Sequence, residues 1–170
     1  MDFSKMRKGH LIIGYKYDKK LCLADVHVIA PGLEREVQYS SASRGKDSGK
    51  LPVAEAFSNF VFKNKDELGD IKFVGFKPDD FLKVVGFSCA KLGSASVMPW
   101  EYVVGVPGKN HFLDLEELIN SFTVERFKAC VGKETLDEIN FDASWLQLGK
   151  NAENDARFAF RLGMLLDLWG

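Results

Sequence analysis

An aspartate stands among small residues on the helix that the spacing predicts over residues 152–169. The small and apolar residues that share one face of this helix are Ala152, Ala156, Ala159, Leu162, Gly163 and Leu166. Asp155 lies on the same face, and a buried carboxylate needs a cation, a hydrogen-bond donor or a metal ion to offset its lost hydration. The small neighbours would let the helix approach a sheet and present this acid there. An alternative is a first-turn acid that the helix dipole favours.

Basic residues gather in the first third of the chain, with tyrosines between them. Lys16, Lys19 and Lys20 stand close to Tyr15 and Tyr17. Lysines grip backbone phosphates and aromatic rings stack on bases, so this segment is a candidate nucleic-acid surface. The alternative is an ordinary solvated hairpin. The formal charge of −1, from 23 basic and 24 acidic residues, gives no overall sign of a nucleic-acid-binding protein.

Other kinds of site have little support. Cys22, Cys89 and Cys130 are odd in number and far apart, which argues against a disulfide framework or a metal finger. We expect three reduced thiols in or near the core of an intracellular protein, in the cytoplasm or nucleus. The three histidines lack metal-ligand spacing, and we expect His27 to be packed in a strand or at its edge. No apolar run reaches the roughly 18 residues of a membrane span, so no membrane is expected.

The elements that would position these residues follow an α/β pattern. Alternating apolar residues and turn signals predict strands over residues 9–17, 21–29, 34–40, 71–76 and 101–106. Helical spacing predicts helices from Pro52 and from Pro78, and over residues 113–122, 124–131, 134–139 and 152–169. Strands come early and helices late, which predicts a mixed sheet covered by helices. The length of 170 residues fits one domain spanning residues 1–170.

The segment that opens the last helix resembles the third motif of DnaQ-like 3′–5′ exonucleases. Residues 148–158 read LGKNAENDARF, and the pattern of a fungal exonuclease-like branch is His-Asn-Ala-Gly-Asn-Asp-Ala. The matching positions are Asn151, Ala152, Asn154, Asp155 and Ala156. The resemblance covers this short segment, at the end of the domain where the family has it. It implies an exonuclease-like domain with a ribonuclease H-like fold, a mixed β-sheet flanked by helices.

The resemblance also implies positions for the other two motifs. The family places an Asp-x-Glu on the first strand, and here Gly14 and Lys16 stand at those positions. Its second motif is a strand, a turn with a histidine, and an aspartate in the next helix. Residues 73–82 resemble this loosely, with Asp79 or Asp80 as the surviving acid. The turn, which includes Lys77, lacks the usual histidine. In the third motif, Lys150 stands where the family has its general base.

These replacements change the chemistry that the resemblance implies. The family hydrolyses phosphodiesters with two divalent metal ions held by acids, and a base prepares the attacking water. Losing two carboxylates removes most of the charge that holds the ions, and Lys16 adds a cation that could pair with Asp155 instead. We therefore predict a catalytically inactive, exonuclease-like scaffold without a cofactor, which binds a protein partner or RNA in RNA metabolism or silencing. The candidate nucleic-acid contacts are Lys16, Lys19, Lys20, Lys77 and Lys150.

Two alternatives stay open. One is an active 3′–5′ exonuclease that binds Mg²⁺ or Mn²⁺ with rearranged ligands around Asp155 and Asp79 or Asp80. A shift of a few residues in the first motif would bring Asp18 or Asp25 into that site. The other is a protein–protein module that never meets RNA or single-stranded nucleic acid, which the near-neutral charge favours. The sequence favours no particular oligomeric state.

Overall fold

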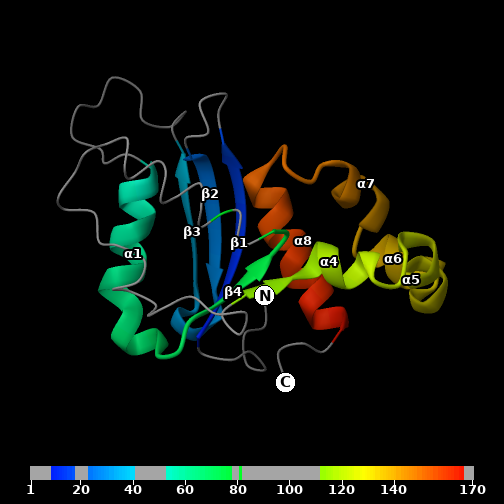
Figure 1. The fold of residues 1–170 in the computed structure, drawn as a ribbon, viewed down its shortest axis with the longest axis horizontal. Coiled ribbons are helices and arrows are strands. Elements are labelled where there is room, and N and C mark those ends of the chain that lie inside the picture. The colour runs from blue at the N-terminus through cyan, green and yellow to red at the C-terminus, as the bar shows by residue number, and fades with distance from the viewer. Residues whose placement is uncertain (1–8, 18–22, 41–52, 78–80, 82–111, 167–170) are drawn as a thin grey trace.

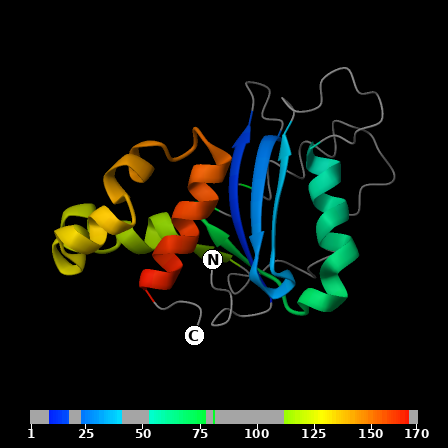
Figure 2. The same ribbon diagram turned by 180° about the vertical axis from the view of Figure 1, so that it is seen from behind.

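Five strands form one mixed sheet with helices on both faces (Figures 1 and 2). The computed structural model describes residues 9–17, 23–40, 53–77, 81 and 112–166. The strands are β1 (His10–Tyr17), β2 (Leu23–Ala30), β3 (Arg35–Ser40), β4 (Lys72–Gly75) and β5 (Phe112–Asp114). The helices are η1 (Pro31–Leu33, a 3₁₀ turn), α1 (Val53–Leu68), α4 (Leu115–Asn120), α5 (Val124–Val131), α6 (Lys133–Glu138), α7 (Phe141–Leu146) and α8 (Ala152–Leu165).

The strands lie in the order β3-β2-β1-β4-β5. β1, β2 and β3 pair antiparallel, as a meander, while β4 and β5 run parallel to β1. In the first pair Gly14 lies opposite His27 and Lys16 lies opposite Asp25. Since side chains alternate along a strand, Gly14 and Lys16 belong to the same face of the sheet. The antiparallel pairing agrees with the predicted hairpin, whose turn lies outside the described residues.

Large side chains fill the space between the sheet and α1. The rings of Phe57 on α1 and Phe81 meet edge to face, with centroids 4.9 Å apart. Leu11 and Ile13 of β1 and Phe73 of β4 belong to the same buried cluster. Apolar residues at helical spacing on α1 therefore meet the alternate residues of the central strands, and burial of this surface stabilises the pairing.

Small residues bring α8 against the other face of the sheet. A side-chain carbon on Gly14 would lie 1.9 Å from the carbonyl oxygen of Ala152 and 2.5 Å from the amide nitrogen of Ala156. Only glycine fits at such an approach, because any Cβ would overlap the helix backbone. Asn151 is the N-cap of the helix, and its side chain accepts a hydrogen bond from the Asn154 amide at 3.1 Å. Ala156 and Ala159 continue the contact into a second core.

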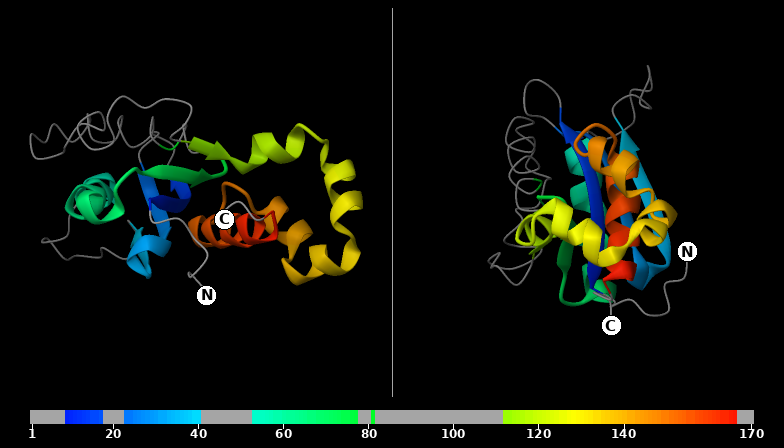
Figure 3. Two further views of the ribbon diagram at one scale, coloured as in Figure 1. Left: turned by 90° about the horizontal axis from the view of Figure 1, so that it is seen from below. Right: turned by 90° about the vertical axis from the view of Figure 1, so that its right-hand side faces the viewer.

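The helices α4 to α7 extend to one side of the sheet and return to α8 (Figures 1 and 3). Asp114 caps α4 by accepting from the amides of Glu116 and Glu117. The aromatic rings that join these helices to α8 belong to Phe76, Phe127, Phe141, Trp145 and Phe158. Among the helices in the described ranges, none combines the length and apolar character needed to cross a membrane.

Most of the predicted elements are confirmed. The strands predicted over residues 9–17, 21–29, 34–40 and 71–76 and the helices predicted from Pro52 and over 124–131 and 134–139 are present, and α8 starts at its predicted first residue. The helix predicted over residues 113–122 is wrong at its start, where residues 112–114 form β5 instead. Helix α7 was not predicted. The strand over residues 101–106 and the start of the helix at Pro78 lie outside the described residues.

The expectation for the cysteines is wrong in one case. Cys130 is exposed on α5 and is a free thiol. It lies on the polar side of an amphipathic helix whose buried residue is Phe127. Cys22 and Cys89 lie outside the described residues.

Candidate functional site

Three of the predicted lysines lie near the end of the sheet where β1 and β4 finish. Lys16 is near the end of β1, Lys77 follows β4, and Lys150 precedes α8, whose first residue covers Gly14. The side chains of all three are exposed. The Tyr15 hydroxyl donates to the carbonyl oxygen of Lys77 at 3.3 Å, which ties the ends of β1 and β4 together. We call Lys16, Lys77 and Lys150 the lysine edge.

Four other predicted site residues cannot be placed on this edge. Lys19 and Lys20, predicted to contact nucleic acid, lie outside the described residues, as do Asp79 and Asp80, the candidate acids of the second motif. Of the two alternative acids of the first motif, Asp18 also lies outside the described residues, and Asp25 lies on β2 opposite Lys16. Its carboxylate accepts a hydrogen bond from the hydroxyl of Ser40 on β3. Asp25 therefore has a structural partner in the sheet.

Gly14 lies directly beneath the first turn of α8. The clash distance of 1.9 Å for an added Cβ is to the backbone of Ala152, which cannot rotate away as a side chain would. A carboxylate at this position would require the helix to move outward. The backbone of α8 therefore leaves no room for any side chain at position 14 of β1.

Asp155 is buried, with 5 % of its surface exposed, and both of its oxygens have hydrogen-bond donors. The backbone N–H of Gly149 donates to Oδ2 at 2.8 Å, and the side-chain amide of Asn154 donates to Oδ1 at 3.1 Å. Burial raises the pKa of Asp155 to about 6, although these two hydrogen bonds act in the opposite direction. Through the hydrogen bond from Gly149, the Asp155 carboxyl group links the turn before α8 to the first turn of the helix.

The other residues that match the third motif also stabilise this turn. The Asn151 side chain caps α8, and the Asn154 amide donates to the carbonyl oxygen of Ser144 on α7 at 3.3 Å as well as to Asp155. Ala152 and Ala156 make the close contact with β1. Each matching residue therefore has a packing or hydrogen-bonding role of its own.

The predicted pairing of Lys16 with Asp155 is not found. Lys16 is exposed, whereas the described partners of the Asp155 carboxylate are Gly149 and Asn154. The fit of a two-metal centre to the described residues is poor, since Gly14 offers no ligand and Lys16 carries a positive charge. Within the described ranges, no three or more His, Cys, Asp or Glu residues come together as metal ligands would.

A shallow depression of about 570 Å³ lies beside the lysine edge, between Lys77 and α4. The Lys77 amide donates to Oδ1 of Asp114 at 3.1 Å, and its ammonium lies 3.9 Å from Glu116. The backbone of Lys77 has a positive φ of 55°. Asp114 and Glu116 were not among the predicted site residues. Asp114 directly before a run of helical residues was the signal that could have identified it as a helix cap.

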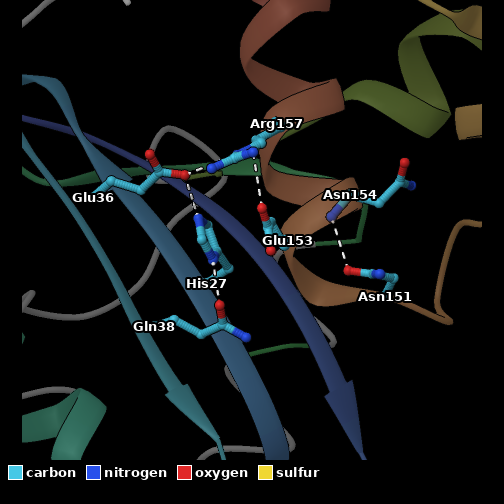
Figure 4. Close-up of polar contacts among 7 residues, drawn as sticks. All are labelled: His27, Glu36, Gln38, Asn151, Glu153, Asn154 and Arg157. Carbon is cyan, nitrogen blue, oxygen red and sulfur yellow. Dashed lines mark hydrogen bonds and ion pairs between the residues drawn. The ribbon is translucent and has the colours of Figure 1, made fainter.

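A second polar cluster joins β2, β3 and α8 (Figure 4). His27 is buried, with 4 % of its surface exposed, as the prediction of a packed strand residue requires. Its Nε2 lies 2.5 Å from Oε1 of Glu36, and its Nδ1 lies 3.2 Å from Oε1 of Gln38. An ionised carboxylate only accepts, so Nε2 must carry a hydrogen.

Arg157 connects this cluster to α8. Its Nε donates to Oε1 of Glu36 at 3.0 Å, and its Nη1 lies 2.8 Å from Glu153 (Figure 4). Burial alone would raise the pKa of Glu36, but the hydrogen bonds from His27 and Arg157 outweigh it and hold that pKa below its ordinary value. Glu36 and Arg157 were not among the predicted site residues. The alternation of β3, which places residues 36 and 38 on one face, was the available signal.

The comparisons with known proteins add no relative from which roles could be transferred. No protein-family model, no curated protein sequence and no solved structure matches this chain.

Proposed function

We propose that this chain is a catalytically inactive, exonuclease-like domain that binds a partner without cleaving phosphodiesters. The strand order β3-β2-β1-β4-β5, with β2 antiparallel to its neighbours and β4 and β5 parallel to β1, supports a ribonuclease H-like assignment. The α8 helix packed across β1 agrees with the position that the third-motif resemblance implies. A fold by itself does not determine an activity, so the side chains of the site decide whether catalysis is possible.

The close contact between Gly14 and α8 is the main observation in support of a catalytically inactive domain. Two-metal hydrolysis needs several acids whose oxygens converge on the ions. Here the helix backbone occupies the space above Gly14, and Asp155 uses both oxygens to hold the turn at Gly149. A divalent ion at Asp155 would have to displace these hydrogen bonds without a second acid from β1.

The exposed lysine edge and the near-neutral overall charge point to a local interaction surface. Lys16, Lys77 and Lys150 are exposed on one end of the sheet. We favour a protein partner, because the formal charge of −1 provides no general attraction for nucleic acid. RNA or a single-stranded nucleic acid is the second ligand class, because exposed lysines can neutralise backbone phosphates.

A combined cleavage and binding assay tests the proposal. A labelled single-stranded RNA is incubated with the protein and Mg²⁺ or Mn²⁺, and the same RNA is titrated at low salt by fluorescence anisotropy. We expect no cleavage by the wild type. Metal-dependent cleavage that Asp155→Asn abolishes would overturn the proposal and establish an active exonuclease.

A matched pair of triple variants separates the two ligand classes. The first variant changes Lys16, Lys77 and Lys150 to Gln. The control changes Lys63, Arg126 and Lys133 to Gln; these residues are exposed elsewhere on the protein, and their replacement removes the same amount of positive charge. RNA binding that only the first variant loses would identify the lysine edge as an RNA surface. Absence of RNA binding by the wild type would leave a protein partner as the ligand.

A further inference from the structure

A polar depression of about 350 Å³ lies between α7 and α8. The two helices run side by side there (Figure 2). It is lined by residues of α7, of α8 and of their flanks: Asn140, Ser144, Gln147, Asn151, Glu153, Asn154, Arg157 and Arg161. Glu153 is the acidic residue of this lining, and its carboxylate is paired with Arg157. Arg157 and Arg161 are four residues apart and share a helix face that is turned away from Ala152 and Ala156, although Arg157 still reaches Glu36 on β3. The depression is therefore separate from the space above Gly14.

The two arginines of this depression differ in their partners. Arg157 is neutralised by Glu36 and Glu153, at 3.0 and 2.8 Å. Arg161 donates from Nη2 to the hydroxyl of the buried Ser144 at 3.2 Å, and no carboxylate pairs with it in the part of the chain that the structure describes. Its Nε is buried and lacks a hydrogen-bond partner within the same ranges.

The environment of Arg161 makes its positive charge costly. Burial, and then the nearby charge of Arg157, lower the pKa of the Arg161 guanidinium below its ordinary value. A partly buried guanidinium beside a second one is stabilised when an anion neutralises it. An anion in the depression would supply the counter-charge that the described residues do not provide.

The remaining lining favours an anion with several oxygens. Asn140 and Gln147 contribute side-chain amides from α7, and Asn151 uses its Oδ1 as the helix cap, which leaves its NH₂ group as a donor. These donors come from two helices and so approach the depression from different sides. A phosphate group has three strong acceptor oxygens arranged tetrahedrally, whereas a carboxylate has two in a plane.

We propose that the depression between α7 and α8 binds a phosphate group, with Arg161 as the charged anchor and the amides of Asn140 and Gln147 as further donors. The phosphate could come from a free nucleotide or from the backbone of an RNA strand, since both present the same chemistry. The inference does not require the exonuclease-like assignment, although Asn151 and Asn154 belong both to the lining and to the segment that resembles the third motif.

Nuclear magnetic resonance of the full chain tests the site with inorganic phosphate at constant ionic strength. We expect phosphate to shift the side-chain signals of Asn140, Gln147 and Arg161 in the wild type, and acetate to shift them far less. This measurement needs no variant. Absence of phosphate-dependent shifts at these residues, or equal effects of acetate and phosphate, would overturn the proposal.

Variants then test the role of the guanidinium. Arg161→Gln should weaken phosphate binding about tenfold or more, because it removes a charge-assisted hydrogen bond. Arg126→Gln, the same change at an exposed position on α5, should bind phosphate as the wild type does. Equal phosphate affinity in Arg161→Gln and the wild type would contradict the proposal. Arg161→Lys keeps the charge, and it serves as the test if Arg161→Gln does not fold.

Two further ligands identify the source of the phosphate. Adenosine monophosphate represents a free nucleotide, and a short single-stranded RNA without terminal phosphates represents the backbone. Tighter binding of the nucleotide than of inorganic phosphate, with the same Arg161 dependence, would identify a nucleotide site. Tighter binding of the RNA would identify a strand-binding site.

Discussion

The two faces of the sheet are packed in different ways. On the α1 face, large rings such as those of Phe57, Phe73 and Phe81 fill the interval between helix and sheet. On the α8 face, Gly14 lies against the backbone of Ala152 without a side chain between them. Packing on the α1 face depends on large apolar side chains, whereas packing on the α8 face depends on the lack of a side chain at Gly14. The α8 face thus has no room for a side chain at position 14, whereas the α1 face is filled by large ones.

The largest expected effect is loss of apolar volume on the α1 face. Phe57→Ala should lower the free energy of unfolding by about 4 kcal/mol, because it leaves a cavity beneath a fully buried ring. Phe62→Ala, on the same helix but partly exposed, should cost less than about 1 kcal/mol. Urea unfolding of both variants measures the difference, and equal losses would contradict the assignment of the α1 core.

Adding a side chain on the α8 face should lower the free energy of unfolding nearly as much as removing a ring on the α1 face. Gly14→Ala should lower the free energy of unfolding by about 3 kcal/mol, since α8 must move away from β1 to admit one methyl group. The control is Gly69→Ala, where a positive φ of 70° and open space predict a cost of about 1 kcal/mol. A Gly14 variant that is as stable as the Gly69 variant would mean that α8 does not lie on β1 so closely.

The polar cluster at the border of the α8 face should contribute less. Glu36→Gln should lower the free energy of unfolding by about 1–2 kcal/mol at pH 7, because His27 and Arg157 lose a charged acceptor. The pKa of Glu36 is lowered in the folded state, so its stabilisation is present above its ordinary value of 4.5 and is lost as the pH falls through the lowered value.

The pH dependence provides the check on Glu36. The difference between the wild type and Glu36→Gln should shrink as unfolding is measured at successively lower pH. Glu67→Gln, an exposed change on α1, should show no such difference at any pH. A gap between wild type and Glu36→Gln that stays constant down to pH 3 would contradict the ion-paired arrangement.

Asp155 should show the smallest effect and the opposite pH trend. Its pKa is raised from 3.8 to about 6, so the folded state retains a proton that the unfolded state releases between these values. The stability that this carboxyl contributes is present below pH 3.8 and is lost as the pH rises through 6. Asp155→Asn does not titrate, and it should be within about 1 kcal/mol of the wild type at pH 7.

Urea unfolding between pH 4 and pH 7 measures this trend. The stability of Asp155→Asn should improve relative to the wild type as the pH rises. If the wild type instead became more stable relative to Asp155→Asn as the pH rose, the ionised carboxylate would have to be stabilised by a cation or a metal ion.

The sequence predicts the sheet better than it predicts the site. Alternating residues identify β1 to β3, and the small residues after Asn151 identify α8 and its buried aspartate. Helix α7 escapes prediction because it is short and starts from Asn140 in a left-handed conformation, with φ of 53°. The three-residue strand β5 is too short for periodicity to reveal, since it is defined by pairing with β4.

Partners of the polar residues could not be predicted, because they come from distant parts of the chain. Arg157 meets Glu36 across the border of β3 and α8, and no spacing rule connects two such positions. Gly14 could be seen as a missing acid, but its close contact with α8 requires the packed fold. Asp155 could be identified as a buried acid that needs donors, whereas Gly149 as one of those donors could not.

Calorimetric titration of Mn²⁺ into the wild type and Asp155→Asn tests the central claim most directly. The claim is that α8 packed on Gly14 leaves Asp155 as a structural residue rather than a metal ligand. It predicts that both proteins give the same signal, without specific binding that depends on Asp155. Stoichiometric binding of Mn²⁺ to the wild type that the variant loses would contradict it.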